Sequence, residues 1–301
     1  MNTNICYDIL IIGAGPAGMT AAIYAGRSNK QVALIDKNGF GGNIANSPKV
    51  ENIPGFVSIS GADFAANMYE QISNFSTVNH IIAEALFIDY RYGLFRITLD
   101  DKSIICGKTL IFATGTEHRQ LKLDTKDIYY CATCDGPFFK NKNVIVVGSG
   151  NTGATYALEL STYCKNVYLC DLTHEMQCEP ILQDQILAQS NIYWLPNTTI
   201  KDVKNGKNNN LSSVILTTNE VLKCNAIFAA IGIIPQTKIV GPFADVTWDD
   251  YIISNDGIST KVPGVFIAGD CRDTKVKQVV TAVSDGAKAA VNAMTFLKGL
   301  K

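Results

Sequence analysis

The sequence predicts an α/β protein of two βαβ domains with parallel sheets, the second domain being inserted into the first. Its 301 residues suit about two domains, and 47% apolar against 18% charged residues supply enough apolar material for two cores. One pattern of strand, glycine-rich turn, helix, strand and acidic residue occurs twice along the chain. The net charge of −1 gives no basis for nucleic-acid binding through bulk charge.

The first copy of the pattern predicts a dinucleotide site in a Rossmann-like unit. An apolar strand, Ile9–Ile12, leads into the turn Gly13-Ala14-Gly15-Pro16-Ala17-Gly18 and a helix that runs to about Ser28. The strand Val32–Ile35 then ends at Asp36, 23 residues after the first glycine. Glycines in this frame let backbone N–H groups approach a pyrophosphate at the helix N-terminus, and the carboxylate can accept bonds from ribose hydroxyls.

The second copy repeats this order with the same spacing. The strand Val144–Val147 precedes the turn Gly148-Ser149-Gly150-Asn151-Thr152-Gly153 and a helix to about Tyr163. The strand Val167–Cys170 ends at Asp171, again 23 residues after the first glycine. For this copy an ordinary glycine-rich turn between parallel strands stays open as an alternative to a nucleotide site.

Two later segments indicate that the chain returns to the first unit. Residues 109–115 and 264–270 each read as an apolar strand followed by a turn of small residues, and the second turn carries an acid. Ligands bind at the carboxyl ends of parallel strands, so we expect both turns to border the first site. We therefore expect a discontinuous domain of residues 1–116 and 241–301, with residues 117–240 as the inserted domain.

The N-terminal residues contain no basic segment ahead of an apolar one, so a signal peptide is not expected. The weakly polar run from Ile9 to Gly26 is interrupted by glycine and proline, which favours a strand, a turn and a helix over a membrane span. The scattered cysteines, nine in number, suit reduced thiols. A cytoplasmic protein without a membrane segment is the expectation.

One cysteine pair is separated from the others by its spacing. Cys131 and Cys134 are separated by two residues, and Asp135 follows at once. A zinc site would need a second ligand pair, but the other cysteines are single and the three histidines are far apart. Two buried structural cysteines remain an alternative. The adjacent carboxylate favours a redox pair, because thiol–disulfide exchange needs proton transfer.

Taken together, these residues resemble the low-molecular-weight thioredoxin reductases, the FAD-containing pyridine nucleotide–disulfide oxidoreductase type, over essentially the whole chain. The stretches that carry the resemblance are Gly13-Ala14-Gly15-Pro16-Ala17-Gly18, Gly41-Gly42-Asn43-Ile44, Val50-Glu51-Asn52-Ile53-Pro54-Gly55, Ala113-Thr114-Gly115, Cys131-Ala132-Thr133-Cys134-Asp135-Gly136, Gly232-Ile233-Ile234-Pro235-Gln236-Thr237, Gly269-Asp270 and Lys277-Gln278-Val279. The resemblance implies FAD as cofactor. The FAD-binding residues that it implies are Gly13, Gly15, Pro16, Ala17, Gly18, Asp36, Lys37, Gly41, Gly42, Asn43, Asn52, Thr114, Gly115, Gly269, Asp270, Lys277, Gln278 and Val279.

The same resemblance implies the catalytic roles. Cys134 would take electrons from the flavin, and Cys131 would attack the disulfide of thioredoxin. Asp135 would protonate the departing thiolate. A homodimer with thioredoxin as partner is the assembly that the resemblance implies.

The sequence departs from the family where NADPH would bind. The family has the pattern H-R-R-x-x-x-R after the second βαβ strand, whereas this chain has Asp171 to Gln177, and residues 166–200 contain no Lys or Arg. Bidentate contacts to a 2′-phosphate are therefore missing. Thr155-Tyr156 also stands where the family often has two glutamates.

NADPH is accordingly not the expected reductant. The chain is most similar to the ferredoxin-dependent flavin thioredoxin reductases, so ferredoxin is the expected electron donor. Two alternatives stay open. One is an NADH-dependent reductase in which Asp171 accepts ribose hydroxyls, and the other is an O₂-dependent oxidase of small dithiols that has no thioredoxin partner.

Overall fold

The computed structural model describes residues 6–47 and 50–300, with the backbone alone at Cys134. The chain divides into two compact units, each described here by itself. Unit 1 comprises the residues up to Glu117 together with those from Ile234 onward, and unit 2 is His118–Ile233. The expected inserted domain ran to residue 240, but Val240 packs in the core of unit 1 beside Phe243.

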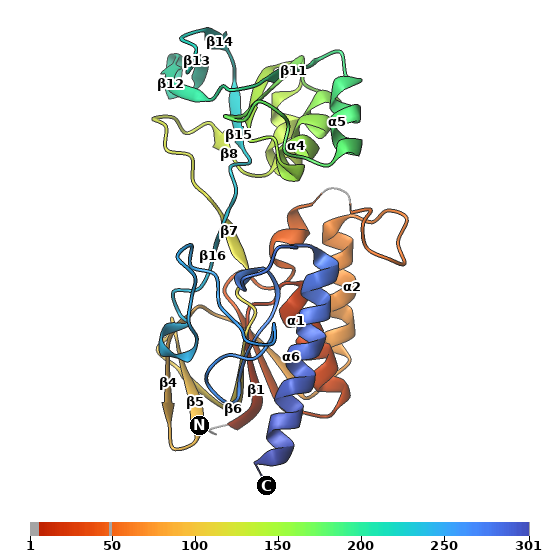
Figure 1. The fold of residues 1–301 in the computed structure, drawn as a ribbon, viewed down its shortest axis with the longest axis vertical. Coiled ribbons are helices and arrows are strands. Elements are labelled where there is room, and N and C mark those ends of the chain that lie inside the picture. The colour runs from red at the N-terminus through yellow and green to blue at the C-terminus, as the bar shows by residue number, and fades with distance from the viewer. Residues whose placement is uncertain (1–5, 48–49, 301) are drawn as a thin grey trace. The chain divides into compact units, whose positions relative to one another are not determined.

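Unit 1 is built on a seven-stranded sheet in the order β3-β2-β1-β6-β5-β4, with β17 also paired to β6 (Figure 1). Its strands are β1 (Cys6–Ile12), β2 (Val32–Asp36), β3 (Val78–Ile82), β4 (Ala85–Arg91), β5 (Leu94–Leu99), β6 (Ile104–Phe112) and β17 (Val265–Ile267). All run parallel except β4 and β5, which form an antiparallel meander against β6. The first half of β6 pairs with β5 and its second half with β17, so β6 begins earlier than the expected Thr109.

Three helices cover one face of this sheet. They are α1 (Pro16–Arg27), α2 (Gly61–Ser73) and α6 (Val279–Gly299), and α1 lies between the other two (Figure 1). Alternate residues of β1 serve the two faces, because Ile9 and Ile11 pack under the helices while Leu10 and Ile12 pack in the opposite core. Short 3₁₀ turns complete the unit: η1 (Gly42–Asn46), η4 (Gly241–Phe243) and η5 (Gly269–Cys271).

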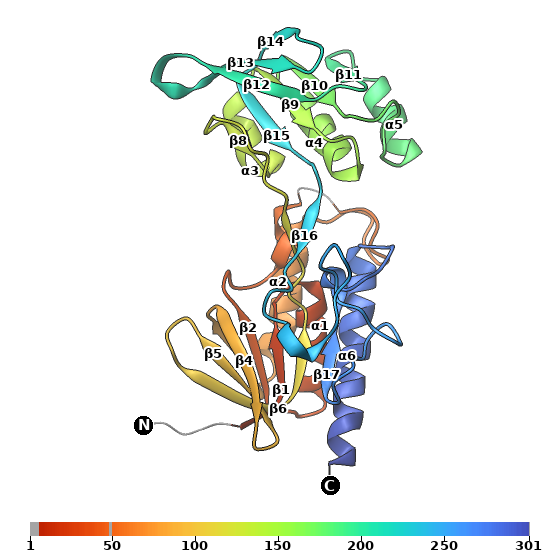
Figure 2. The same ribbon diagram turned by 60° about the vertical axis from the view of Figure 1, so that its left-hand side comes forward.

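Unit 2 contains a five-stranded parallel sheet in the order β11-β10-β9-β15-β8 and a separate three-stranded antiparallel sheet (Figure 2). Its parallel strands are β8 (Ile128–Tyr129), β9 (Asn143–Val147), β10 (Asn166–Cys170), β11 (Ile192–Leu195) and β15 (Ala226–Ala229). The antiparallel strands are β12 (Ile200–Asn205), β13 (Leu211–Leu216) and β14 (Val221–Lys223). The helical segments are α3 (Ala132–Asp135), η2 (Gly136–Phe139), α4 (Asn151–Ser161), α5 (Pro180–Leu187) and η3 (Lys207–Asn209).

The two connections between the units pair with each other as the strands β7 (Thr116–His118) and β16 (Ile233–Pro235). The predicted α/β class with two Rossmann-like units is confirmed, and both βαβ copies occur where the sequence places them. Their helices end slightly early, at Arg27 and Ser161. Among the described residues, none of the helices has the length and apolar character needed to cross a membrane.

Candidate functional site

The first glycine turn lies between β1 and α1, and the fold itself requires two of its glycines. A Cβ on Gly13, whose φ is +105°, would stand 2.1 Å from the carbonyl oxygen of Ala113. A Cβ on Gly18 would stand 1.8 Å from the carbonyl oxygen of Gly13. At Gly15 the nearest atom would be 3.9 Å away, so this glycine leaves room for a ligand over the N-terminus of α1.

Further predicted residues close around this turn. The N–H of Gly41 donates to Ala14 O at 2.8 Å, and a Cβ on Gly42 would lie 3.1 Å from Gly15 Cα. Asn43 follows in η1 and donates through Nδ2 to Thr116 O at 2.9 Å. Gly41 and Gly42 therefore lie against the first glycine turn and form one surface with it.

The acid at the end of β2 faces the same turn. Asp36 Oδ2 accepts from the N–H of Ala14 at 2.7 Å, and its Oδ1 accepts from Asn38 N at 2.8 Å. Lys37 points elsewhere: its Nζ lies 3.4 Å from a carboxylate oxygen of Glu117 and 3.6 Å from one of Glu84.

The turn after β6 supplies an unpaired polar atom. Thr114 Oγ1 is buried and has no hydrogen-bond partner among the described residues. Gly115 follows with φ +63°, and no heavy atom lies within 4 Å of the place where its Cβ would be. A buried hydroxyl without a partner is costly unless a ligand satisfies it, so this edge suits a polar ligand.

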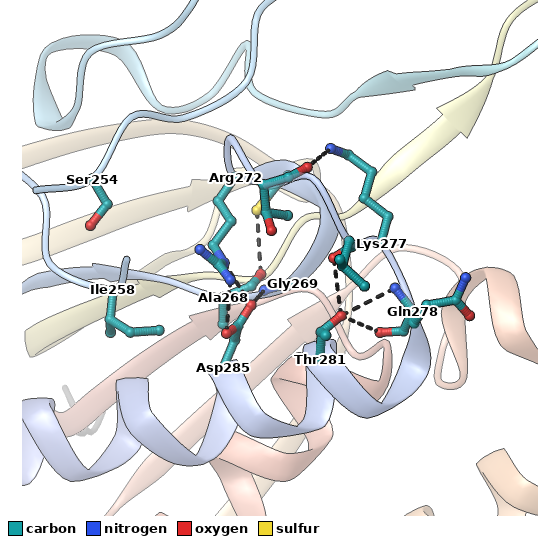
Figure 3. A network of polar contacts seen from close by, with 12 residues as sticks. Ser254, Ile258, Ala268, Gly269, Arg272, Lys277, Gln278, Thr281 and Asp285 are labelled. Atoms are coloured by element: carbon teal, nitrogen blue, oxygen red, sulfur yellow. Dashed lines mark hydrogen bonds and ion pairs between the residues drawn. The ribbon is translucent and has the colours of Figure 1, made fainter. Parts of the chain in front are cut away.

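An ion pair beneath the Gly269–Asp270 turn fixes its position (Figure 3). Arg272 Nε and Nη2 donate to Asp285 at 2.6 and 3.1 Å, and Asp285 Oδ2 also accepts from Gly269 N at 3.3 Å. The Asp285 side chain, in α6, is 4% exposed. Burial raises the pKa of Asp270, with Lys277 acting in the opposite direction.

The N-terminus of α6 completes this edge. Gln278 is the N-cap and forms a capping box with Thr281, which makes Val279 the first residue of the helix (Figure 3). Asn52 donates to Gln278 Oε1 at 3.0 Å, joining residues 226 positions apart. Lys277 Nζ donates to Thr274 O at 2.8 Å and lies 4.0 Å above the ring centroid of Tyr251.

Unit 1 thus gathers most of the predicted cofactor-binding residues at the carboxyl ends of β1, β2, β6 and β17. Three features fit an extended dinucleotide: the open Gly15 at the start of a helix, the buried Thr114 hydroxyl and the partly buried acid Asp270. Of the predicted set, Lys37 is the residue that the structure directs into surface ion pairs.

The second glycine turn, between β9 and α4, matches the first closely. A Cβ on Gly148, with φ +104°, would stand 2.2 Å from Ala230 O, and one on Gly153 would stand 1.8 Å from Gly148 O. Around Gly150, which has an ordinary φ of −69°, there is nothing within 4 Å. Packing therefore explains the outer two glycines and leaves the middle one unexplained.

Asp171, the acid of this second turn, accepts more hydrogen bonds than Asp36 does at the first turn. Asp171 Oδ2 accepts from Ser149 N at 2.6 Å and from Ser149 Oγ at 2.8 Å, and Oδ1 accepts from Thr173 N at 3.1 Å. Burial would raise the pKa of Asp171, but these hydrogen bonds outweigh it and hold the pKa below the ordinary value. A negative charge is thus fixed where a 2′-phosphate would have to bind.

The predicted redox pair begins at the end of β8. Cys131 is disulfide-bonded and precedes the short helix α3, in which Asp135 N donates to Cys131 O at 3.2 Å. The side chain of Cys134 lies outside the described residues, so its role stays a prediction. Burial raises the pKa of Asp135, which suits a carboxyl group that holds a proton. Seven other cysteines are free thiols: Cys6, Cys106, Cys164, Cys170, Cys178, Cys224 and Cys271.

Helix α4 supports this motif with residues that the sequence analysis missed or left without a role. Glu159 Oε2 accepts from Thr133 Oγ1 at 3.0 Å, and the hydroxyl of Tyr156 donates to Tyr130 O, next to Cys131. Burial raises the pKa of Glu159. In the sequence, Glu159 was recognisable only as a polar residue on the otherwise apolar face of a helix. Through its hydroxyl, Tyr156 connects α4 to the residue that precedes Cys131.

Comparison with known proteins agrees with these features. The family model for pyridine nucleotide-disulphide oxidoreductases matches residues 7–286. A thioredoxin reductase of Bacillus subtilis is 32% identical over 320 residues, covering 100% of this chain and 98% of its own. The crystal structure of Lactococcus lactis thioredoxin reductase has a TM-score of 0.91 at 30% identity, covering 97% of this chain and 99% of its own. The thioredoxin reductase of T. acidophilum gives a TM-score of 0.89 at 32% identity, with 98% and 99% covered.

Proposed function

The chain belongs to the pyridine nucleotide-disulphide oxidoreductase family, and from that premise we propose a thioredoxin-disulfide reductase that receives its electrons from reduced ferredoxin. FAD is the cofactor, and the turns of unit 1 would hold it through Gly15, Thr114 and Asp270. When bound, FAD accepts electrons singly or in pairs and can deliver two to a disulfide.

The observation that carries the reductase proposal is the disulfide-bonded Cys131 four residues before Asp135, a partly buried acid whose pKa is raised by burial. Once this disulfide is reduced, the Cys131 thiolate attacks one sulfur of the thioredoxin cystine, forming a mixed disulfide. The Cys134 thiol then displaces reduced thioredoxin and restores the original disulfide. Asp135 donates the proton that the departing thiolate needs.

The proposal of ferredoxin as donor rests on the second nucleotide turn. Residues 166–200 supply no Lys or Arg, and Asp171 places a fixed negative charge at the ribose end. The hydroxyl of Tyr156 donates to Tyr130 O, next to Cys131. A plant-type ferredoxin near −400 mV lies about 130 mV below thioredoxin, which is about 6 kcal/mol for two electrons. The reaction is therefore favourable.

One observation favours NADH as a second candidate donor. Gly150 has an ordinary φ and open space around it, so packing does not require glycine there. In dinucleotide sites the middle glycine is needed for the close approach of the pyrophosphate. Asp171 Oδ1, which accepts one bond, could still accept a ribose hydroxyl.

Anaerobic reduction by NADPH, NADH and reduced ferredoxin in parallel tests the proposal. We expect ferredoxin to bleach the flavin absorbance and to drive formation of thioredoxin thiols, while NADPH does neither. The variant Cys134→Ser should keep its flavin and lose disulfide reduction. Rapid bleaching by NADH at micromolar concentration would replace ferredoxin by NADH, and colourless protein that rejects FAD would overturn the whole proposal.

We also propose that the chain forms a homodimer and that it is located in the cytoplasm. Light scattering on the purified holoprotein tests the first, with twice the chain mass as the expected result.

A further inference from the structure

Two free cysteines meet at the end of unit 1 opposite to the candidate cofactor site. Cys6 is the first residue of β1, and in the parallel register of the sheet it pairs with Cys106 of β6. The glycine turn and the Thr114 turn follow the other ends of these same strands. The cysteine pair is therefore separate from the cofactor cradle, and neither residue has a role in the proposed reaction.

The register gives the pair a geometry suited to a disulfide. Neighbouring strands lie about 4.8 Å apart, and Cα separations of about 4.4–6.8 Å accommodate a disulfide. Directly paired residues project to the same face of a sheet. Two residues further along the same strands, Lys108 Nζ donates to Asp8 at 3.0 Å, so side chains at this end of the strands do reach one another.

The surroundings give a peroxide access to the pair, and one cation offsets part of the cost of forming a thiolate. Cys6 is exposed, and Cys106 is partly exposed. Burial, the neighbouring Cys106 thiol and the Asp8 carboxylate raise the pKa of Cys6 above its ordinary value, and the ammonium group of Lys108 opposes part of that rise. On the other side of β6, Cys106 pairs in register with Arg96 of β5, whose Nε lies 3.7 Å from a carboxylate oxygen of Asp89. The thiolate is therefore a small fraction of Cys6 at neutral pH, and the exposure of this residue is what lets a peroxide reach that fraction.

We propose that Cys6 and Cys106 form a second, reversible disulfide when the protein meets a hydroperoxide. The Cys6 thiolate attacks one peroxide oxygen, the O–O bond breaks, and the other oxygen leaves as water after protonation. The resulting sulfenic acid is attacked by the Cys106 thiol, which forms the S–S bond and releases a second water. Two thiols lose two electrons and two protons, and one hydrogen peroxide gains them.

The strand end makes this closure feasible. Cys6↔Cys106 is the first pair in the β1–β6 register, so the sulfurs can approach through a twist of the strand terminus without moving the pairs behind it. The bond would join the two strands whose far ends carry the Gly13 turn and Thr114. Oxidation at this end therefore ties together the strands that support the candidate cofactor site.

Peptide mapping of the peroxide-treated holoprotein tests the proposal. The folded protein is treated with hydrogen peroxide, unfolded in an alkylating reagent and digested without reductant. We expect a linked peptide pair that contains Cys6 and Cys106, has lost two hydrogens and disappears after dithiothreitol. The buried thiols of Cys164 and Cys224 should not be oxidised by the peroxide. Both should therefore be found alkylated and serve as internal controls.

The variants Cys6→Ser and Cys106→Ser provide the matched controls. Each should reduce thioredoxin as fast as the unmodified protein before oxidation, since neither residue belongs to the proposed site, and neither should give the linked pair. The unmodified protein should also gain a higher melting temperature on oxidation, which both variants lack. Alkylation of both cysteines after peroxide treatment, separate over-oxidation of each, or a linkage between two chains would overturn the proposal.

Discussion

Asp135 follows the redox pair directly, and burial raises its pKa above the ordinary value of 3.8. The neutral carboxyl group therefore persists to higher pH than in an ordinary aspartate. A proton donor acts only while it is protonated. The rate of the step that depends on Asp135 should therefore decline as pH rises through the raised pKa.

The variant Asp135→Asn tests this role. We expect thioredoxin reduction to fall by about 10²–10⁴-fold and the declining limb of the rate–pH profile to disappear. The profile of kcat/KM for thioredoxin, measured with saturating donor, gives both readings. A variant with the parent profile would show that another group supplies the proton.

The same shift has a consequence for stability. A raised pKa in the folded state means that protonation favours folding, so this contribution is complete below pH 3.8 and is lost as pH rises through the raised pKa. Asp135→Asn has no such loss, and the stability difference between parent and variant should change in that window alone.

Asp285 joins three parts of unit 1, since it binds Arg272, accepts from Gly269 N and lies in α6 (Figure 3). Asp285→Asn leaves the Arg272 guanidinium, 16% exposed, without its charge partner. Removing one partner of a buried pair costs about 3 kcal/mol, so the free energy of unfolding should fall by about that amount. Flavin release should occur at lower urea concentration, because the Gly269 turn loses its anchor.

The exposed pair Lys261–Asp245 is a matched control in the same unit. Lys261→Ala should change the free energy of unfolding by less than about 1 kcal/mol, because exposed ion pairs contribute little. Equal losses in the two variants, measured by urea unfolding, would contradict a special role for Asp285.

At the scale of elements, the two glycine turns contain glycines that serve different purposes. Gly148→Ala would place a methyl group 2.2 Å from Ala230 O at a φ of +104°, so it should strongly destabilise unit 2. Gly150→Ala meets nothing within 4 Å, and we expect stability to stay equal or to rise by about 0.5 kcal/mol, because the unfolded chain loses freedom.

Gly150→Ala also separates the two candidate donors. With ferredoxin as donor, turnover should not change, since no pyrophosphate has to approach the turn. With NADH as donor, the methyl group should weaken nucleotide binding at least tenfold, an effect of about 1.4 kcal/mol. We would measure the rate of flavin reduction as a function of NADH concentration, and the rate of turnover with ferredoxin. The two measurements together show which donor the protein uses.

The sequence predicted those elements whose cause is local. The strands β1, β2, β9 and β10 are short apolar runs that end at glycine or acid, and each glycine turn sets its own backbone path. The β4–β5 meander escaped prediction because β4 does not alternate: Leu86 and Phe87 are neighbours and both are exposed. Pairing of β4 with β5, which in turn pairs with β6, makes it a strand, rather than its own pattern.

The candidate site shows the same limit. Gly13, Asp36 and the turn at Thr114 follow from strand ends, so the sequence could group them. Arg272–Asp285 and Thr133–Glu159 are contacts between a turn and a helix that pack only in three dimensions. In the sequence, Asp285 stands out only as an acid within a helix rich in alanine. That pattern does not identify Arg272 as its partner.

At the scale of the molecule, the candidate cofactor site belongs to unit 1 and the candidate redox pair to unit 2. This assignment predicts how fragments of the chain should behave. Each unit has its own buried cores, and the two crossing segments, β7 and β16, pair with each other. In unit 1, Gln236 N donates to Gly115 O at 2.9 Å, so the ends left by removing residues 118–233 lie close together. A short linker can therefore replace unit 2.

We expect the linked unit 1 to fold, to bind FAD and to lack thioredoxin reduction, because the redox pair lies in the removed part. The fragment of residues 118–233 should fold without flavin and should show the Cys131 disulfide by thiol counting before and after reduction. Circular dichroism and flavin absorbance check both results. A yellow 118–233 fragment would contradict the assignment of the cofactor to unit 1, and an unfolded unit 1 would show that the units depend on each other for stability.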